Sequence, residues 1–451
     1  MRCKSILAIS LVLSLYGQGL AQARSAGKPI PAPTAKVASD VKAKDLGGHT
    51  KKGIAYLVST QNEDGGWGEG EEAPGMGGAK GAKPSNVADT SIAVLALIRS
   101  GSTPSSGEHA KRVAKGLDFI AASIEKSDDK SLFVTDVRGT RVQSKIGVYV
   151  DTFLSSLVLA EAKGRMPDAV SEKRIGNALD KVIGKIESNQ KADGTFEGNA
   201  GWASVLSTGI AGKSLNRARA AGAAVSDDSL RRAEGQAVAS FDRSSGGFKS
   251  AGAGGLGASA PSDAGVPIYN TSAQLSSLQD ANATNVVKEK EYKEVLADAK
   301  APKAAKDQAK KELGRIEATR EIKNEAVKSV VKSLENDQFI SGFGSNGGEE
   351  FLSYMNISET LVAEGGSEWK KWDREIGDNL ARVQNADGSW SGNHCITGRT
   401  FVTAAALLVL TTDRIGMNAQ VKGSGASLET GKEPVKESVA SKSWYEKIWN
   451  E

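Results

Sequence analysis

Cysteine is almost absent from this chain, which has two in 451 residues. Cys3 lies in an amino-terminal leader that we expect to be removed, so only Cys395 would remain in the mature protein. A single cysteine cannot form an intramolecular disulfide, even in an oxidising compartment. The stability of the fold must therefore come from packing.

Long hydrophobic runs and an excess of charge of one sign are also missing. The longest apolar run after the leader, Phe401 to Leu410, is about half of the roughly 20 residues that a membrane span needs, so we expect no transmembrane anchor. The 58 basic and 54 acidic residues leave a net charge of only +4. This balance argues against binding to nucleic acid or to an anionic membrane surface.

The amino terminus has the pattern of a cleavable signal peptide. Arg2 and Lys4 precede an apolar stretch, and Ala21, Gln22 and Ala23 form an A-x-A cleavage site. We therefore interpret residues 1–23 as a signal peptide and residues 24–44 as a flexible linker. Cys3 precedes the apolar stretch, which does not fit a lipoprotein anchor. The mature protein is expected to begin near Arg24 and to be secreted or periplasmic.

Three segments of the chain resemble one another. They are QNEDGGW at Gln61 to Trp67, QKADGTF at Gln190 to Phe196, and QNADGSW at Gln384 to Trp390. Each follows a helical pattern, and its Asp-Gly pair accepts the left-handed backbone conformation that ends a helix. The aromatic residue is then expected to pack back on the helix ends.

Between these markers, two kinds of helix alternate along the chain. Helices with one apolar face are expected at residues 45–61, 108–125, 171–190, 227–241, 321–337 and 368–384. Helices that are apolar on most sides are expected at residues 86–100, 147–163, 202–220, 269–280, 354–364 and 396–412. Six amphipathic outer helices around six apolar inner helices predict an all-α fold, an (α/α)6 toroid over residues 45–413.

The connections differ in length at the two ends of this toroid. Most connections from an outer to an inner helix are long and rich in glycine, so the long loops and the amino-termini of the inner helices should share one end, where function is expected. Residues 287–324, rich in Lys, Glu and Ala, read as a charged helical hairpin or coiled coil inserted at the opposite end. Residues 414–451 read as a polar tail that ends in a short amphipathic helix, SWYEKIWNE.

The spacing of the three repeated segments resembles the QW repeat of the terpenoid cyclase and protein prenyltransferase superfamily. This resemblance covers about residues 45–413 and implies an α/α toroid with a central cavity. It also implies that the repeat residues are structural; these are Gln61, Trp67, Gln190, Phe196, Gln384 and Trp390. Phe196 departs from the Trp of the pattern.

The catalytic motifs of the superfamily are missing. Squalene-hopene-type cyclases protonate an alkene through a D-x-D-D motif that is not in this sequence, and aromatic residues, which stabilise carbocations, make up only 5% of the chain. The pairs Asp128-Asp129 and Asp227-Asp228 are better explained by helix ends. In the thioester proteins of the superfamily, Gln follows Cys by three residues, whereas Gly398 stands three residues after Cys395.

The zinc site of prenyltransferases is also incomplete. His394 stands near the start of the last inner helix, but Asn356 and Ser358 occupy the two-apart positions where Asp and Cys would bind zinc. A metal held by His394, Cys395 and either Asp89 or Asp151 is an alternative, and Cys395 is also a weak candidate nucleophile. We favour structural roles for these residues and predict no metal and no cofactor, with zinc disfavoured.

Polar residues recur near the starts of the inner helices. They are Asp89, Thr90, Asp151, Thr152, Asn270, Asn356 and Arg399. Residues of these types cap helices, which is the simpler explanation. Alternatively, they line a cavity mouth that binds the polar group of an amphiphile, with its tail in an aliphatic lumen.

These observations leave two main hypotheses and a weaker third. The favoured one is an exported binding or interaction module for a hydrophobic or amphiphilic small molecule or for a protein partner. The alternative is a divergent cyclase-like or prenyltransferase-like enzyme that uses Asp89, Asp151 or a metal centred on His394. A glycan-active barrel is the third, and the repeated turns argue against it.

Overall fold

The computed structural model describes residues 37–72, 84–252 and 260–416. The expected signal peptide, most of the linker at residues 24–44 and nearly all of the tail at residues 414–451 lie outside these ranges. Within them, no helix has the length and apolar character required to span a membrane.

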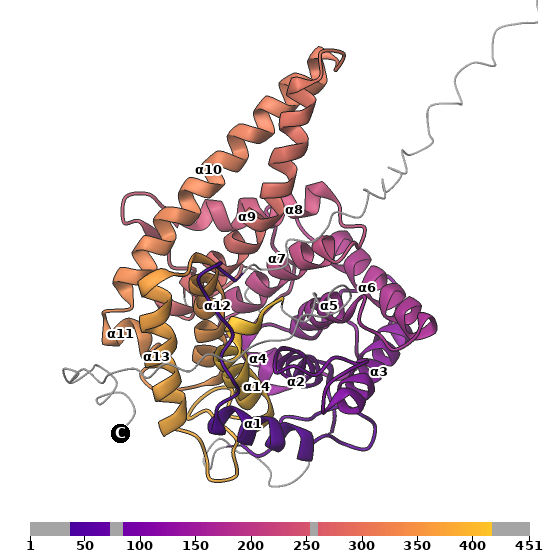
Figure 1. The fold of residues 1–451 in the computed structure, drawn as a ribbon, viewed down its shortest axis with the longest axis vertical. Helices are drawn as coiled ribbons and strands as arrows, with labels where there is room; N and C mark the ends of the chain where they lie inside the picture. Colours follow the sequence, from indigo (N-terminus) through magenta and orange to yellow (C-terminus); the bar gives the residue numbers. More distant parts are fainter. Residues whose placement is uncertain (1–36, 73–83, 253–259, 417–451) are drawn as a thin grey trace, which may run out of the picture.

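Six helices of the described residues form a closed inner ring (Figure 1). They are α2 (Val87–Arg99), α5 (Val150–Ala162), α7 (Val205–Ala220), α9 (Pro267–Ala297), α12 (Gly348–Glu364) and α14 (Arg399–Leu410). Each packs against the next, and α14 packs against α2 to close the ring. These helices are buried on nearly every side, except where α9 continues beyond the ring.

An outer layer of amphipathic helices covers the inner ring. It consists of α1 (Gly48–Ser59), α3 (Ala110–Lys126), α6 (Ala169–Asn189), α8 (Asp227–Ser240), α10 (Lys303–Ser333) and α13 (Gly366–Arg382). Each of these helices packs against an inner helix. In α13, for example, Trp369, Trp372, Ile376 and Leu380 are buried at helical spacing, while the intervening residues face solvent. The prediction of an all-α toroid is therefore confirmed.

The remaining elements are short. Helices α4 (Arg141–Ile146) and α11 (Asp337–Ile340) lie in long loops, and a 3₁₀ turn covers Thr412–Arg414. Strands β1 (Phe241–Asp242) and β2 (Gly247–Phe248) form an antiparallel pair in which Phe241 is opposite Phe248. None of these elements contributes to the inner ring.

The expected start of one inner helix was wrong. We expected this helix at residues 354–364, but α12 begins six residues earlier, at Gly348. The glycine-rich segment before Phe351 misled this prediction, because such segments are typical of loops. In the structure, Gly347 is the N-cap residue, and the Glu350 carboxylate accepts a hydrogen bond of 2.9 Å from its backbone N–H.

The charged hairpin is continuous with two helices of the toroid. Helix α9 runs from the inner ring out to Ala297, and α10 returns from Lys303 into the outer layer, so the two helices protrude together (Figure 1). Pro302 occupies the N-cap position of α10, where its missing N–H costs no helical hydrogen bond. Ion pairs such as Arg320 with Glu289 connect the two helices.

The first and third repeated segments make equivalent contacts. The amide nitrogen of Gln61 donates to Gly65 O in its own turn and to Arg112 O of α3, at 2.8 and 2.9 Å. The amide nitrogen of Gln384 donates in the same way to Gly388 O and to His49 O of α1. Each glutamine thereby connects its turn to the next outer helix, and the third segment joins the end of the toroid to its beginning.

The tryptophans of the same two segments form hydrogen bonds to the helices that precede them. The indole N–H of Trp67 donates to Leu57 O, and that of Trp390 donates to Leu380 O, each at 2.8 Å. Phe196 in the second segment has no such donor, and both polar side-chain atoms of Gln190 are buried without a hydrogen-bond partner. The second segment thus keeps the turn and the buried ring but not these side-chain hydrogen bonds.

The rings of these tryptophans require glycine on the facing helices. A Cβ atom at Gly53 of α1 would lie 2.6 Å from the Trp390 ring. A Cβ atom at Gly116 of α3 would lie 2.4 Å from Val94 Cγ2 of α2 and 3.0 Å from the Trp67 ring. Contacts below about 3 Å force the neighbouring atoms to move. The close approach of outer helices to the repeated turns therefore depends on the absence of a side chain.

We predict that Gly53→Ala destabilises the protein by about 1–3 kcal/mol, because its methyl group would overlap the Trp390 ring. Gly176→Ala in α6 is the matched control, since a Cβ atom there meets no atom within 4 Å. Alanine at this half-buried helical position should stabilise by about 0.5–1 kcal/mol. Denaturant midpoints measure both variants, and equal effects of the two substitutions would contradict this account.

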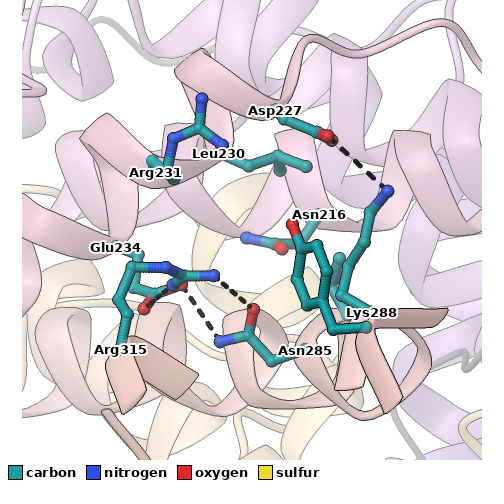
Figure 2. A pocket seen from close by; sticks show the side chains of 10 residues that line it. Asn216, Asp227, Leu230, Arg231, Glu234, Asn285, Lys288 and Arg315 are labelled. Carbon is teal, nitrogen blue, oxygen red and sulfur yellow. Dashed lines mark hydrogen bonds and ion pairs between the residues drawn. The ribbon is translucent and has the colours of Figure 1, made fainter. Parts of the chain in front are cut away.

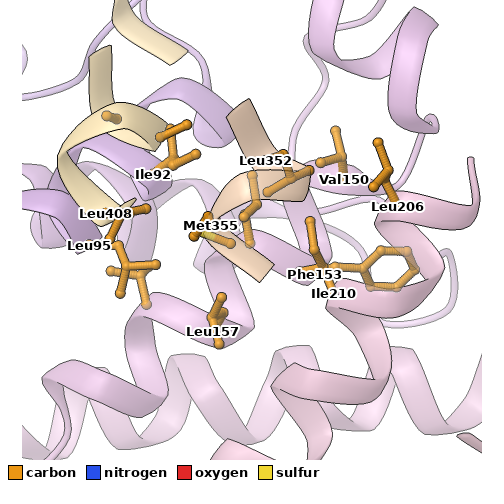
Figure 3. Packing of buried hydrophobic residues seen from close by; sticks show 14 of the residues in the cluster. Ile92, Leu95, Val150, Phe153, Leu157, Leu206, Ile210, Leu352, Met355 and Leu408 are labelled. Atoms are coloured by element: carbon orange, nitrogen blue, oxygen red, sulfur yellow. The ribbon is translucent and has the colours of Figure 1, made fainter. Parts of the chain in front are cut away.

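Aliphatic side chains fill the axis of the toroid at the described residues. Figure 3 shows side chains from five inner helices converging, with Met355 of α12 between Leu95 of α2 and Phe153 of α5. The labelled residues are at most 2% exposed, which leaves no water-sized space beside them. The aliphatic lumen that we expected is thus a packed core.

Charged side chains occupy the axis nearer to the carboxyl ends of the inner helices. We call them the axial ion network; its members are Arg99, Glu161, Lys213, Arg217, Asp280 and Glu359. Three cations face three carboxylates, so the network is electrically balanced. A balanced, hydrogen-bonded set of charges reduces the desolvation penalty that an unpaired buried charge would carry.

Glu359 of α12 is at the centre of the axial ion network. Its carboxylate accepts hydrogen bonds from Lys213 and Arg217, each at 2.6 Å, and also from Arg99. Burial alone would raise the pKa of Glu359, but the charges of these three cations hold that pKa well below its usual range. The carboxylate therefore remains ionised although it is only 3% exposed.

We predict that Glu359→Gln destabilises the protein by about 3–5 kcal/mol, because it leaves three buried cations with two carboxylates. Glu368→Gln, at an exposed position of α13, is the control and should change stability by less than about 0.5 kcal/mol. Thermal unfolding followed by circular dichroism measures the difference. A neutral effect of Glu359→Gln would show that the network does not stabilise the ring.

Candidate functional site

Two segments far apart in the sequence lie side by side at the end of the toroid that carries the long loops. Gly347 pairs with His394 in a parallel bridge, and Gly348 N donates to Ile396 O at 2.9 Å. The first segment leads into α12 and the second leads into α14. The starts of two neighbouring inner helices are thereby connected, and their side chains form the candidate site.

Glu350 is the most extensively bonded residue of this site. It accepts hydrogen bonds from the backbone N–H groups of Phe343 and Gly347 and from the Tyr269 hydroxyl of α9. Its Oε2 atom also lies 3.3 Å from Nε2 of His394. Glu350 therefore caps α12 and ties three elements together with one buried carboxylate.

One ring nitrogen of His394 has a hydrogen-bond partner, and the other has none. Its Nε2 atom lies 2.7 Å from the carbonyl oxygen of Ser345, whereas Nδ1 is buried without a hydrogen-bond partner. Burial opposes the charged form of the ring, but contacts with Cys395 and Glu350 outweigh it and raise the pKa of His394 to about 11. These contacts favour the charged form of the ring, whose Nε2 faces Glu350.

Glu349 is fully buried and only partly hydrogen-bonded. Its Oε2 atom accepts from Ile396 N at 3.4 Å, while Oε1 has no partner. Burial, followed by the charge of the neighbouring Glu350, raises the pKa of Glu349 to about 7. One carboxylate oxygen each of Glu349 and Glu350 and one nitrogen of His394 lie within 4.8 Å of one another. This carboxylate pair with an imidazole is the main chemical feature of the site.

Cys395 follows in a strained conformation. Its φ angle is +50°, and it is buried, with 9% exposure. Non-glycine residues in the left-handed region cost free energy and persist where the surroundings impose them, which is common at functional sites. Cys395 directly follows His394, which pairs with Gly347.

Aromatic side chains extend from this cluster to the surface. We call Trp202 and Phe343 the aromatic strip: their rings meet edge to face at 6.1 Å, and the Phe343 ring is 5.3 Å from that of His394. Phe343 is 53% exposed, and the Lys145 ammonium lies 5.7 Å from the Trp202 ring. Large exposed apolar side chains grouped with a cation are typical of binding surfaces.

Asp89 and Thr90 lie in the first turn of α2, as expected, but face the protein interior. The Asn86 side chain donates to Asp89 Oδ2 at 2.7 Å, and Thr90 exchanges hydrogen bonds with the backbone of Trp67. Both residues are 0% exposed. The contact of Asp89 is thus typical of a helix start, and the contacts of Thr90 join α2 to the first repeated segment.

Asp151, Thr152 and Asn270 are likewise buried at helix starts. Asp151 accepts from Ala88 N at 3.0 Å and from the Gln143 amide at 2.7 Å, and burial raises its pKa. Thr152 donates to Leu132 O, and Asn270 donates to Lys249 O. These side chains connect inner helices to loops.

Asn356 is not at the mouth, because α12 begins at Gly348. Asn356 lies inside α12 and accepts from Lys213 at 2.8 Å, and Ser358 accepts from the Trp372 indole. Arg399 is at the start of α14 and forms ion pairs with Glu71 and Asp387.

The carboxylates that lie beside His394 were not among the predicted site residues. The sequence contained a signal for them: a Gly-x-x-Glu spacing at Gly347 and Glu350 directly before an apolar run, which is typical of a helix start. His394 was identified, but its expected partners Asp89 and Asp151 belong to other helices.

Two cavities lie elsewhere in the described part of the chain. A cavity of about 20 Å³ at the base of the hairpin, lined by Glu234, Asn285 and Arg315 among others, has room for about one water molecule (Figure 2). A cleft of about 420 Å³ lies between α1 and the loop after α2, lined by Leu46, Ile54 and His109 among others. Neither brings together a set of catalytic groups.

Comparison with known proteins supports the resemblance seen in the sequence. A model of the squalene-hopene cyclase C-terminal domain matches residues 35–131, which include α1, α2 and α3. No curated protein matches the chain.

Among solved structures, the chain is similar to an inactive variant of the alpha-1,6-mannanase GH76A of Salegentibacter sp. HEL1_6 in complex with alpha-1,6-mannotriose. The identity is 10% and the TM-score is 0.50, and the match covers 82% of this chain and 99% of that chain. At this identity the likeness concerns the fold alone.

Proposed function

We propose that the chain is an α/α toroid related to the terpenoid cyclase and protein prenyltransferase superfamily, and that it is an exported binding module rather than a cyclase or prenyltransferase. Its ligand is a hydrophobic or amphiphilic molecule, or a protein that presents such a group. The packed axis carries this proposal, because a cyclase or prenyltransferase needs room inside the toroid for its isoprenoid substrate.

The surroundings of Asp89 and Asp151 agree with this proposal. Asp89 and Asp151 are buried and hydrogen-bonded to residues of the chain, so neither is aimed at a space that would admit a substrate. The aromatic strip, in contrast, is partly exposed at the end with the long loops. We therefore place the ligand on the outer surface of that end, with its apolar part on Phe343 and Trp202.

We predict that the purified mature chain returns squalene and farnesyl diphosphate unchanged. Turnover of either compound that is abolished by Asp89→Asn or Asp151→Asn would overturn the proposal. It would favour the alternative, a divergent enzyme that uses inner-helix carboxylates or a His394-centred metal. The cluster of Glu349, Glu350 and His394 is the observation that supports this alternative.

Binding itself is tested by titration calorimetry with farnesol as the amphiphilic probe. We expect Phe343→Ser to weaken binding about five- to thirtyfold, because loss of an exposed aromatic contact costs on the order of 1–2 kcal/mol. Val170→Ser is the matched control: Val170 is 80% exposed, at the start of α6, where outer helices begin at the opposite end. Equal affinities of the two variants would contradict a ligand site on the aromatic strip.

Export is a separate part of the proposal. We predict that expression of the full chain in a bacterium with a periplasm yields a mature protein that begins near Arg24 and is released with the periplasmic fraction. Intact mass spectrometry of the purified protein measures the cleavage position. Retention of residues 1–23 in a cytoplasmic product would contradict the signal peptide.

A further inference from the structure

The cleft between α1 and the loop after α2, which we call the α1 cleft, lies at the end of the toroid opposite the long loops. On its α1 side it is lined by Leu46, Ile54 and Ala55, and on the other side by residues 100–102 and 108–109. Its volume of about 420 Å³ lies within the range of roughly 300–1,000 Å³ for pockets that enclose small ligands. The α1 cleft therefore has room for more than one large side chain.

The last described residues of the chain lie beside this cleft. Lys44 N donates to Asp413 Oδ2 at 2.8 Å, and the Arg414 guanidinium donates to Lys44 O. Leu46, which lines the α1 cleft, follows Lys44 by two residues. Helix α14, from which the chain leaves the toroid, also packs against α1. Residues 417–451 therefore begin next to the α1 cleft.

The sequence predicts one apolar face in residues 443–451, SWYEKIWNE, which we call the terminal segment and which lie outside the described residues. Four of its side chains are large and apolar: Trp444, Tyr445, Ile448 and Trp449. The first and third of these are four residues apart, as are the second and fourth, so on a helix the two pairs form one adjoining face. Helices that bind in grooves present their apolar anchors in this way.

The link to the terminal segment is long enough for it to reach the α1 cleft. Residues 417–442 are rich in Ser, Gly, Lys and Glu, and a coil of this length spans about 30 Å on average. Attachment through such a link raises the effective concentration of the terminal segment at the α1 cleft to the millimolar range. Docking within one chain is thereby favoured over docking on a second copy of the chain.

The charges at the α1 cleft agree with this occupant. Lys51 is exposed at the cleft and has no ion-pair partner among the described residues, and the terminal segment supplies Glu446 as a partner. On the other side of the cleft, the exposed Glu108 is a partner for Lys447 of the terminal segment. Each surface thus offers a cation and a carboxylate to the other around an apolar contact.

We propose that the terminal segment binds as a short helix in the α1 cleft of its own chain, with Trp444 and Trp449 against the apolar side chains of α1. The bound segment covers the helix at which the outer layer begins, so it adds a second connection between the end of the chain and its beginning. This contact is at the opposite end of the toroid from the aromatic strip. It does not depend on the amphiphile binding proposed above.

The test is a disulfide trap in the purified mature chain, in which Cys395 is buried. Ala55→Cys places a thiol in the α1 cleft, and Ile448→Cys places one in the apolar face of the terminal segment. With oxidised glutathione, we expect an intramolecular disulfide to form at least about tenfold faster than in the matched control. The control replaces Ala55→Cys by Asn177→Cys, at an exposed position of α6 that does not line the cleft.

The contribution of the apolar anchors is tested in the trap variant. Adding Trp449→Ser should slow the formation of the disulfide at least about tenfold, whereas Asn450→Ser, outside the apolar face, should leave the rate unchanged. Intact mass spectrometry and non-reducing electrophoresis measure the product, and circular dichroism checks that each variant is folded. Equal rates in the trap and the control pair, or an unchanged rate with Trp449→Ser, would overturn the proposal. A disulfide between two chains would overturn it in favour of docking on a second copy.

Discussion

Closure of the inner ring is the constraint on which the rest of this structure depends. Helices that are apolar on most sides, such as α2 and α14, cannot face water, and each therefore needs two inner neighbours and one outer neighbour. The contact between α14 and α2 supplies the last of these neighbours. The hydrogen bond from Gln384 to His49 O reinforces this contact in the outer layer, where α13 leads back to α1.

The closed inner ring also determines which side chains fill the axis of the toroid. Its axis is filled by aliphatic residues in one part and by the axial ion network in the other, and both exclude solvent. The toroid therefore has a closely packed axis at the described residues. At the end with the long loops, the exposed Phe343 ring lies beside His394, and Glu349 and His394 each have a buried polar atom without a hydrogen-bond partner.

Much of the fold could be predicted from the sequence because its signals are local. The periodicity of α3 and the Asp-Gly turn after Gln61 depend on residues near them in the chain. The start of α12 was wrong by six residues, because Gly347 and Gly348 resemble a loop until the capping contact of Glu350 is known. The candidate site could not be predicted in full, since the pairing of residues 347 and 394 joins segments that no local pattern connects. The axial ion network was missed for the same reason: Arg99 and Glu359 are separated by 260 positions.

The hairpin has a mechanical consequence. Helix α9 contains 31 residues without a break, which corresponds to a rod of about 46 Å. Asp280 of the axial ion network lies on the same rod as Glu289, which pairs with α10 outside the ring. One continuous helix therefore connects the protruding hairpin directly to the electrostatic centre of the toroid.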